Sequence, residues 1–476
     1  MKRPSQSDAP ASYTRRRVLA AATAGVGAAA AVGGCRPSLS SSSSTGAAAV
    51  GTLKIDFAKT AFSPLLKSKI GVGRALNSTE ILDSLQYLDE IRPALYDGEI
   101  RFPETDSPAM KPYPIEVGKD GTVEVRGNTF IDKLHIELRR RNIDVMHQLM
   151  GAPKPWENKA AAKPPRKFPS PTDLKAAADA MGRWAALYDD HPVSWCMWNE
   201  PSHNLTGKPD RASIKQMVDL YEAYTNEIGP RGLFGMASFV PVDARPNKEL
   251  DGRTYLETLV DELRKRRKGA SGLPFDYLTM NNYGEDFTEL VEGARNALAG
   301  DFNTVPLIQA QFGVLRPGEW EKKRGTAVEA ARFMGELKTA LAIPDLQTFT
   351  FSGWVSHIIT YKDDKALKLP LFHALKLYSR MPDRRTPVPD GLPDGVGMMA
   401  SGDEHRSSVL VWNETDKAQE IKLDLTAVTA PAQDEAELSV YHIDSKHGSP
   451  LEDSGNEFGP TETTPSGRLP GSSPRP

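Results

Sequence analysis

One short stretch of this sequence carries an acidic side chain to the end of an apolar run. The run "SWCMW" continues into Asn199 and Glu200 and then meets Pro201, which has no backbone N–H for further strand pairing. A carboxyl group that lies beside Trp198, partly shielded from water, holds a proton that it can donate in a reaction. We therefore predict that Glu200 is a general acid that protonates a leaving oxygen.

Other polar and aromatic residues also stand at the ends of apolar runs. They are Arg101, His147, Trp198, Asn281, Tyr283 and Trp354, and we expect them to contact the ligand. Fixed amides and a guanidinium group suit sugar hydroxyls, and aromatic faces suit sugar C–H surfaces, so the set favours a carbohydrate ligand. Arg101 either binds an acidic sugar such as a uronate or pairs with a neighbouring carboxylate. His147, beside Gln148, either lines the site or is a satisfied structural histidine. Trp354 is the candidate stacking platform.

A (β/α)₈ barrel would bring these residues together, because the active site of that fold lies at the carboxyl ends of its strands. Eight short apolar runs alternate with amphipathic helical patterns, such as 77–91 and 174–188. The predicted strands are 69–72, 98–102, 143–149, 193–198, 233–239, 275–280, 305–312 and 346–354. The alternation favours an α/β fold of the (β/α)₈ TIM barrel type, with a doubly wound open sheet as the alternative.

The character of the sequence changes after the helical pattern at 370–382. Short alternating strands follow, which predict a small accessory β-sandwich at 386–450 after a barrel at 52–385. This segment holds few strands, so the sandwich needs more from elsewhere, for example from 52–58. The Ser-rich stretch 36–51 is predicted to be a linker, and 451–476 a disordered tail.

Residues 1–35 have the parts of an export signal. Arg15 and Arg16 precede an Ala/Gly-rich run of moderate hydrophobicity that ends at Cys35. The pattern resembles a twin-arginine signal, and "VGGC" resembles a lipobox. We expect an exported protein that is either secreted or held in the cell envelope by a lipid on Cys35. A poorly hydrophobic membrane helix and a disordered Ala-rich tail are the alternatives.

The composition excludes some partners. The chain has 59 basic and 62 acidic residues, so it has no cationic excess for nucleic acid. Its two cysteines leave no pair for a disulfide if Cys35 is acylated, and Cys196 lies in an apolar run as a small buried residue. No zinc-type Cys/His spacing or phosphate-binding glycine loop is evident, so no metal or cofactor is implied.

Several motifs together resemble the large clan of retaining (β/α)₈ glycoside hydrolases, and most of all glycoside hydrolase family 39, which includes β-xylosidases and α-L-iduronidases. They are "GVGRALN", "EIRFPE", "WCMWNEP", "DYLTMNNYG", "FTFSGW", "PLFHALKLYSRMP" and "VLVWN", and the resemblance covers most of residues 65–450. It implies that Glu200 is the general acid/base and that Asn199 hydrogen-bonds the sugar 2-hydroxyl. It also implies a glycoside hydrolase that acts on an extracellular or cell-envelope polysaccharide or oligosaccharide.

The sequence departs from the family pattern on two strands. The family places a nucleophilic Glu on the seventh strand, where this chain reads "PLIQAQFG" with Gln311, and Asn281 stands where the family usually has His. An amide is a poor nucleophile and supplies no negative charge.

Four explanations of Gln311 are open. The barrel binds glycan without cleaving it, or another carboxylate such as Glu285, Asp286 or Glu319 takes part. Alternatively a 2-acetamido group of the substrate is the nucleophile, with Gln311 orienting the intermediate, or the strand register differs from the one assumed here.

Overall fold

The structure is a computed structural model that describes residues 52–465 with gaps. The gaps are 61–68, 74–79, 103–112, 128, 157–168, 190–192, 205–209, 268–271, 285–286, 317, 345, 364, 416, 429–436, 452–457, 459 and 461. The predictions for residues 1–51, including lipidation of Cys35, lie outside the described residues. Among the described helices, none is long and apolar enough to cross a membrane.

Eight parallel strands close into a barrel. Along the chain they are β2 (Ile70–Gly73), β3 (Leu95–Phe102), β6 (Asp144–Gly151), β7 (Val193–Asn199), β8 (Gly232–Phe239), β9 (Tyr277–Tyr283), β10 (Leu307–Gly313) and β11 (Leu346–Ser352). Their order in the sheet is β10-β11-β2-β3-β6-β7-β8-β9, and β9 closes onto β10. Each strand overlaps one predicted run, so the (β/α)₈ prediction is confirmed and the open-sheet alternative is wrong.

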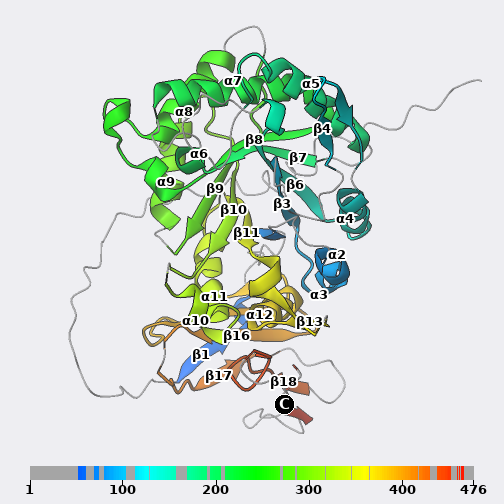
Figure 1. Cartoon of the computed structure of the whole chain (residues 1–476). Helices are drawn as coiled ribbons and strands as arrows, with labels where there is room; N and C mark the ends of the chain where they lie inside the picture. The colour runs from blue at the N-terminus through cyan, green and yellow to red at the C-terminus, as the bar shows by residue number, and fades with distance from the viewer. Residues whose placement is uncertain are drawn as a thin grey trace, which may run out of the picture. The chain divides into compact units, whose positions relative to one another are not determined.

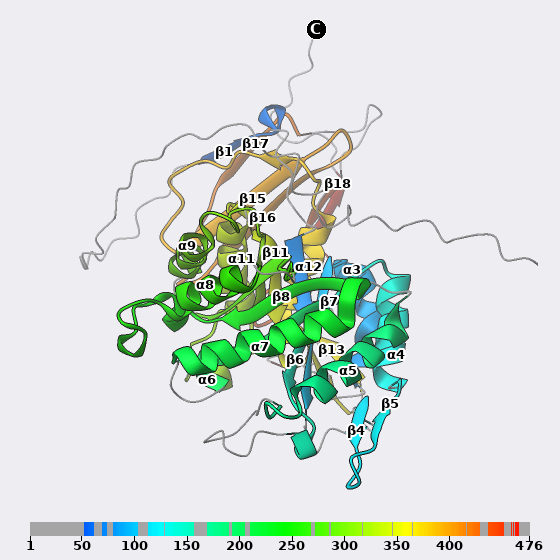
Figure 2. The ribbon, with the colours of Figure 1, turned by 90° about the horizontal axis from the view of Figure 1, so that it is seen from above.

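Amphipathic helices cover the outside of the barrel, as Figure 1 and the view from above in Figure 2 show. The longer ones are α4 (Thr129–Arg140), α5 (Leu174–Ala185), α7 (Arg211–Ile228), α8 (Tyr255–Arg267), α9 (Phe287–Leu298), α11 (Ala327–Leu341) and α12 (Pro370–Arg380). The shorter ones are α2 (Glu80–Ser84), α3 (Leu88–Ile91), α6 (Pro201–Asn204) and α10 (Trp320–Lys323). Their apolar faces and the outward side chains of the strands form one continuous core.

Two short hairpins extend from the barrel. One is formed by β4 (Ile115–Val117) and β5 (Val123–Val125), and the other by β12 (Ile359–Lys362) and β13 (Lys365–Lys368). A kinked segment, Trp354–Ile358, leads from β11 into β12, and Ser356 within it has a positive φ of 85°.

The barrel interior changes from apolar to polar along the strands. Leu95, Met146, Cys196 and Ala310 belong to a small inner apolar cluster. Burial raises the pKa of the Cys196 thiol to about 12, so this cysteine is a buried neutral side chain, as predicted. Residues farther along the same strands are polar, and this change places hydrogen-bonding groups at the carboxyl ends of the strands.

The accessory β structure draws on both ends of the described chain. β14 (Arg385–Thr386), β15 (Val396–Gly402) and β16 (Ser407–Asn413) form an antiparallel sheet. β1 (Leu53–Asp56) pairs in parallel with β17 (Leu423–Thr426), so the predicted contribution from 52–58 is confirmed. β18 (Glu437–Val440) pairs with β19 (Glu462–Pro465), which lies inside the segment expected to be a tail.

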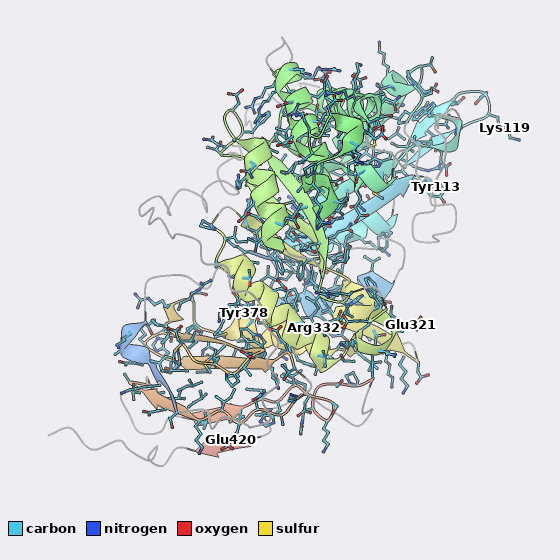
Figure 3. All side chains as sticks on the ribbon, turned by 90° about the vertical axis from the view of Figure 1, so that its left-hand side faces the viewer. Tyr113, Lys119, Glu321, Arg332, Tyr378 and Glu420 are labelled. Carbon is cyan, nitrogen blue, oxygen red and sulfur yellow. The ribbon has the colours of Figure 1, made fainter. Side chains whose placement is uncertain are left out.

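The sheet β14–β15–β16 is apolar on both faces. Met398 and Ala400 pack with the Leu53 and Ile55 side chains of β1. On the other face, Met399 and Trp412 join the barrel core. Figure 3 shows side chains filling the space between this sheet and helices α11 and α12, with Arg332 and Tyr378 labelled there.

Candidate active site

The end of β7 has an unusual backbone that aims the Glu200 side chain. Trp198 has φ 67° and Glu200 has φ 49°, in the left-handed region that bulky residues rarely adopt. The Glu200 N–H donates to the Ser238 carbonyl of β8 at 3.2 Å, and Pro201 begins α6 directly afterwards. Glu200 is half-buried, whereas Asn199 is buried. Such strained positions persist where the surrounding structure holds them, and they are frequent at functional sites.

The Asn281 amide joins three residues of this site. Its Nδ2 donates to Asn199 Oδ1 at 2.7 Å, to Glu200 Oε1 at 3.0 Å and to Gln311 Oε1 at 3.1 Å. Asn281 is fully buried, and its Oδ1 accepts no hydrogen bond from the described residues. The ends of β7, β9 and β10 therefore meet at one nitrogen atom.

A β-bulge turns Gln311 toward the site. The pairing of β10 with β9 shifts register between Gln309 and Gln311, which changes the side of the strand that the following side chains face. Gln311 Oε1 accepts from the Tyr283 hydroxyl at 2.8 Å as well as from Asn281. Because Glu200 and Gln311 share the Asn281 nitrogen, their oxygens are at most about 6 Å apart, near the separation of about 5–5.5 Å in retaining carboxylate pairs.

A second polar group lies behind Gln311 inside the barrel. Gln311 Nε2 donates to Gln148 Oε1 at 3.2 Å, and Gln148 Nε2 donates to Asp97 Oδ2 at 2.7 Å. The Ser238 hydroxyl also donates to Gln148 Oε1, at 3.3 Å. Asp97 and Ser238 were not singled out in the sequence, although an aspartate inside the apolar run "ALYDGEI" was a usable signal for a buried carboxylate.

Three predicted ligand contacts need correction. His147 is fully buried on the outward face of β6, where its Nε2 lies 2.7 Å from His135 Nε2 and its ring packs against Trp184 and Trp195. Its neighbour Gln148 faces the interior because side chains alternate along a strand. His147 is therefore the structural histidine of the two options considered.

The two tryptophans expected at the ligand are also buried. Trp354 is fully buried, and its Nε1 donates to Ser84 Oγ at 2.8 Å, so it offers no open ring face for a sugar. Trp198 is 1% exposed and likewise presents no accessible face. The predictions of Trp354 as a stacking platform and of Trp198 as a ligand contact are therefore wrong.

Not all of the other predicted residues can be placed. The Arg101 backbone belongs to β3, but its side chain and all of Glu285 and Asp286 lie outside the described part of the chain. Glu319 is described, and it pairs with Lys323 at 2.7 Å and Arg332 at 2.8 Å. Hydrogen bonds from these two cations lower the pKa of Glu319 to about 2. Glu319 is thus held in an ion-pair network, which does not favour it as the second catalytic carboxylate.

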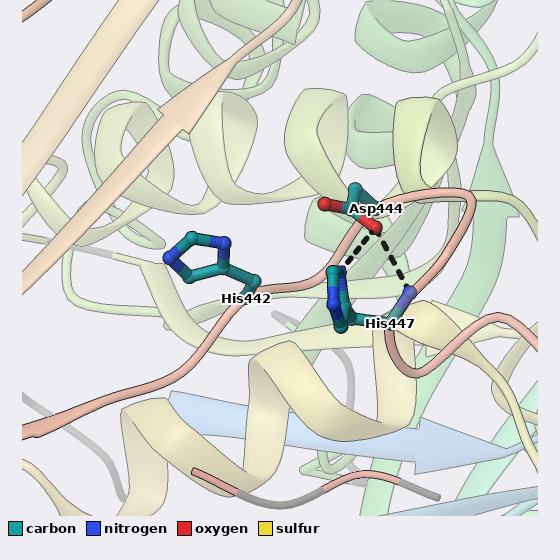
Figure 4. A group of neighbouring side chains, drawn as sticks. All are labelled: His442, Asp444 and His447. Carbon is teal, nitrogen blue, oxygen red and sulfur yellow. Dashed lines mark hydrogen bonds and ion pairs between the residues drawn. The ribbon is translucent and has the colours of Figure 1, made fainter. Parts of the chain in front are cut away.

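One group of described residues could hold a metal ion. Its ligand atoms, from His442, Asp444 and His447, lie within 4.8 Å of one another (Figure 4). However, Asp444 Oδ1 already accepts from the backbone N–H groups of Lys446 and His447 and lies 2.9 Å from His447 Nδ1. These contacts explain the cluster as a closed turn.

Solved glycosidase structures share the fold. A family 39 β-xylosidase from Caulobacter crescentus matches with TM-score 0.65 and 15% identity, over 87% of this chain and 95% of that chain. A bacterial orthologue of human α-L-iduronidase matches with TM-score 0.58 and 14% identity, over 87% and 75%. A family 30 xylanase from Clostridium acetobutylicum matches with TM-score 0.50 and 9% identity, over 81% and 89%.

Comparisons of sequence add nothing to this. No protein-family model matches the chain, and no curated protein matches it. At these low identities, the structural likeness shows that the chain has the (β/α)₈ fold of family 39 and family 30 glycoside hydrolases.

Proposed function

We propose that this protein is a glycoside hydrolase that acts on an extracellular or cell-envelope polysaccharide or oligosaccharide. The observation that carries the proposal is the meeting of Glu200, Asn199 and Gln311 around the Asn281 amide at the carboxyl ends of barrel strands. That end is where (β/α)₈ enzymes bind and convert their ligands. The location rests on the export signal expected in residues 1–35.

Glu200 is the proton donor in this proposal. It is half-buried, so it can reach a ligand, and it belongs to the motif "WNEP" that resembles the acid/base motif of the clan. Asn199 is the hydrogen-bond partner of the sugar 2-hydroxyl. The structures that share the fold support a carbohydrate ligand, since they are named as a β-xylosidase, an α-L-iduronidase orthologue and a xylanase.

A second candidate is a glycan-binding protein that has lost hydrolysis. The fully buried Gln311 amide favours this candidate, because it supplies no nucleophilic oxygen at the position expected for the second carboxylate. Both candidates bind glycan at the same place, and they differ only in turnover.

The test is an assay of aryl glycosides and cell-envelope glycans with the full chain. Glu200→Gln should keep binding and lower turnover about 10²–10⁴-fold, the usual contribution of a positioned proton donor. Glu289→Gln, which removes an exposed carboxylate paired with Arg245, is the matched control and should keep wild-type turnover. Wild-type turnover in Glu200→Gln would reject the role of Glu200. Binding by the wild type without turnover on any glycan would favour the second candidate.

A further inference from the structure

We propose that Asp97 is a positioning residue whose carboxylate, acting through Gln148, fixes the direction of the Gln311 amide. Asp97, Gln148, Gln311 and Asn281 together are called the amide relay below. The relay then carries its carboxylate at Asp97 on β3, and its residue on β10, Gln311, is neutral. The inference rests on hydrogen-bond chemistry alone and not on the proposed activity.

The direction of the relay starts at Asp97. A carboxylate accepts hydrogen bonds and has no proton to give, so the Gln148 atom that faces Asp97 Oδ2 at 2.7 Å must be its NH₂ group. Gln148 Oε1 then faces the other way, toward Gln311 and the Ser238 hydroxyl. Two donors at this oxygen agree with that orientation.

The same reasoning orients the next two amides. Because Gln148 presents an oxygen at 3.2 Å, Gln311 must present its NH₂ group to Gln148 and its oxygen to Tyr283 and Asn281. Asn281 must then present its NH₂ group to Gln311, and the same group reaches Asn199 and Glu200. Asp97 at one end of the relay therefore favours one orientation of all three amides, and the Glu200 oxygen at the other end, which accepts from Asn281, agrees with it.

A carboxylate at position 311 conflicts with this direction. In Gln311→Glu, a carboxylate oxygen would face Gln148 Oε1, and Gln148 could turn its NH₂ group toward it only by turning its oxygen toward Asp97. Buried acceptors that face each other destabilise the fold. Adding Asp97→Asn removes the conflict, because the new amide at position 97 can donate to Gln148 Oε1 while Gln148 donates to the new carboxylate at position 311. The double variant reverses the relay and keeps one carboxylate in it.

The conflict should depend on pH. Among the described residues, the titratable groups around the relay are Asp97 on β3, Glu200 after β7, Tyr283 on β9 and, deeper in the barrel, Cys196 on β7 and Tyr277 on β9. In Gln311→Glu, the conflict is relieved when one carboxyl group of the folded relay stays protonated. The same group releases its proton in the unfolded chain. Native protein then binds more protons than unfolded protein, so stability falls as pH rises above the usual range of carboxyl groups, about 4.

The experiment is a double-mutant cycle on the full chain, measured by thermal unfolding at pH 5 and pH 8. Asp97→Asn and Gln311→Glu should each lower Tm by about 4 °C or more at pH 8, and the double variant should recover at least half of the summed loss. The loss in Gln311→Glu, relative to wild type at the same pH, should be smaller at pH 5. The matched control is Gln309→Glu, which introduces the same charge on the same strand at a buried side chain that contacts Gln311 at its backbone carbonyl and not at its amide side chain. Asp97→Asn should not rescue it.

Additive Tm losses, or equal rescue of Gln309→Glu, would overturn the proposal. If Gln311→Glu yields no soluble protein, recovery of soluble protein in the double variant supports the relay. If neither Gln311→Glu nor the double variant is soluble, the single variant Asp97→Asn decides. A Tm equal to that of wild type would mean that Asp97 does not fix the amides and that the proposal is wrong. These are folding measurements, so their outcome is separate from any result on glycan turnover.

Discussion

Asn281 offers the sharpest test of the site, because one NH₂ group there, with two hydrogens, faces three acceptors on two segments, the end of β7 and β10. Asn281→Ala removes the group, whereas Asn281→Asp keeps the shape and replaces the donor with an acceptor. The acceptors lie 2.7, 3.0 and 3.1 Å away, and they are Asn199 Oδ1, Glu200 Oε1 and Gln311 Oε1 respectively. The two variants therefore separate the loss of hydrogen bonds from a reversal of polarity.

The size of each effect follows from these contacts. A hydrogen bond between neutral groups contributes about 0.5–1.5 kcal/mol net, and one to a charged group about 1.5–3 kcal/mol. Because the NH₂ group has two hydrogens, it makes about two full hydrogen bonds, one of them to Glu200, so Asn281→Ala should lower the free energy of unfolding by about 3 kcal/mol. Asn281→Asp should cost about 1–2 kcal/mol more, because a new carboxylate faces buried acceptors and the Glu200 carboxylate.

The assay is urea unfolding of both variants at pH 7.5, followed by tryptophan fluorescence. Asn296→Asp, an exposed substitution on α9, is the control and should change stability by less than about 0.5 kcal/mol. If Asn281→Asp is no less stable than Asn281→Ala, the three oxygens do not face the amide as described. An Asn281→Asp protein as stable as wild type would refute the reasoning altogether.

Three further predictions concern the rest of the chain. Burial, with Lys376 and Lys368 nearby, lowers the pKa of His373 to about 3, so folding loses stability as pH falls below about 6.5. Because of this group, the free energy of unfolding measured in urea should be about 1.4 kcal/mol lower at pH 5.5 than at pH 7.5. His373→Gln should remove this difference. Ile55→Ala in the buried face of β1 should lower the free energy of unfolding by about 2–5 kcal/mol, measured in the same way. His147→Phe should lower Tm but leave glycan affinity unchanged. Weaker glycan binding by this variant would show that His147 contributes to the binding site.

The barrel was predictable because its strands are covered on both faces. Helices pack outside and side chains fill the inside, so each strand consists largely of consecutive apolar residues, which are easy to recognise in the sequence. The same property hides which residues face inward. The runs lack alternation, so His147 and Gln148 were indistinguishable as candidates until the strand was seen to turn the histidine outward.

Local backbone departures hid the rest of the site. The bulge before Gln311 and the positive φ angles of Trp198 and Glu200 change the direction of side chains by amounts that no simple period predicts. Trp354 was expected at the mouth because it ends the last predicted strand, but the chain kinks after it, and the buried ring donates its N–H to Ser84. Glu200 was found because its position after a strand and before a proline needs no knowledge of orientation.

The parallel pairing of β1 with β17 also determines the order in which the protein can be completed. The Thr426 hydroxyl donates to the Ile55 carbonyl across 371 residues of sequence. A ribosome that has made β1 must therefore make every barrel strand before the partner of β1 exists. Until then β1 is an unpaired edge, and unpaired edges recruit strands from other chains. Among the described strands, the first to be made therefore waits through the longest stretch of synthesis for its partner.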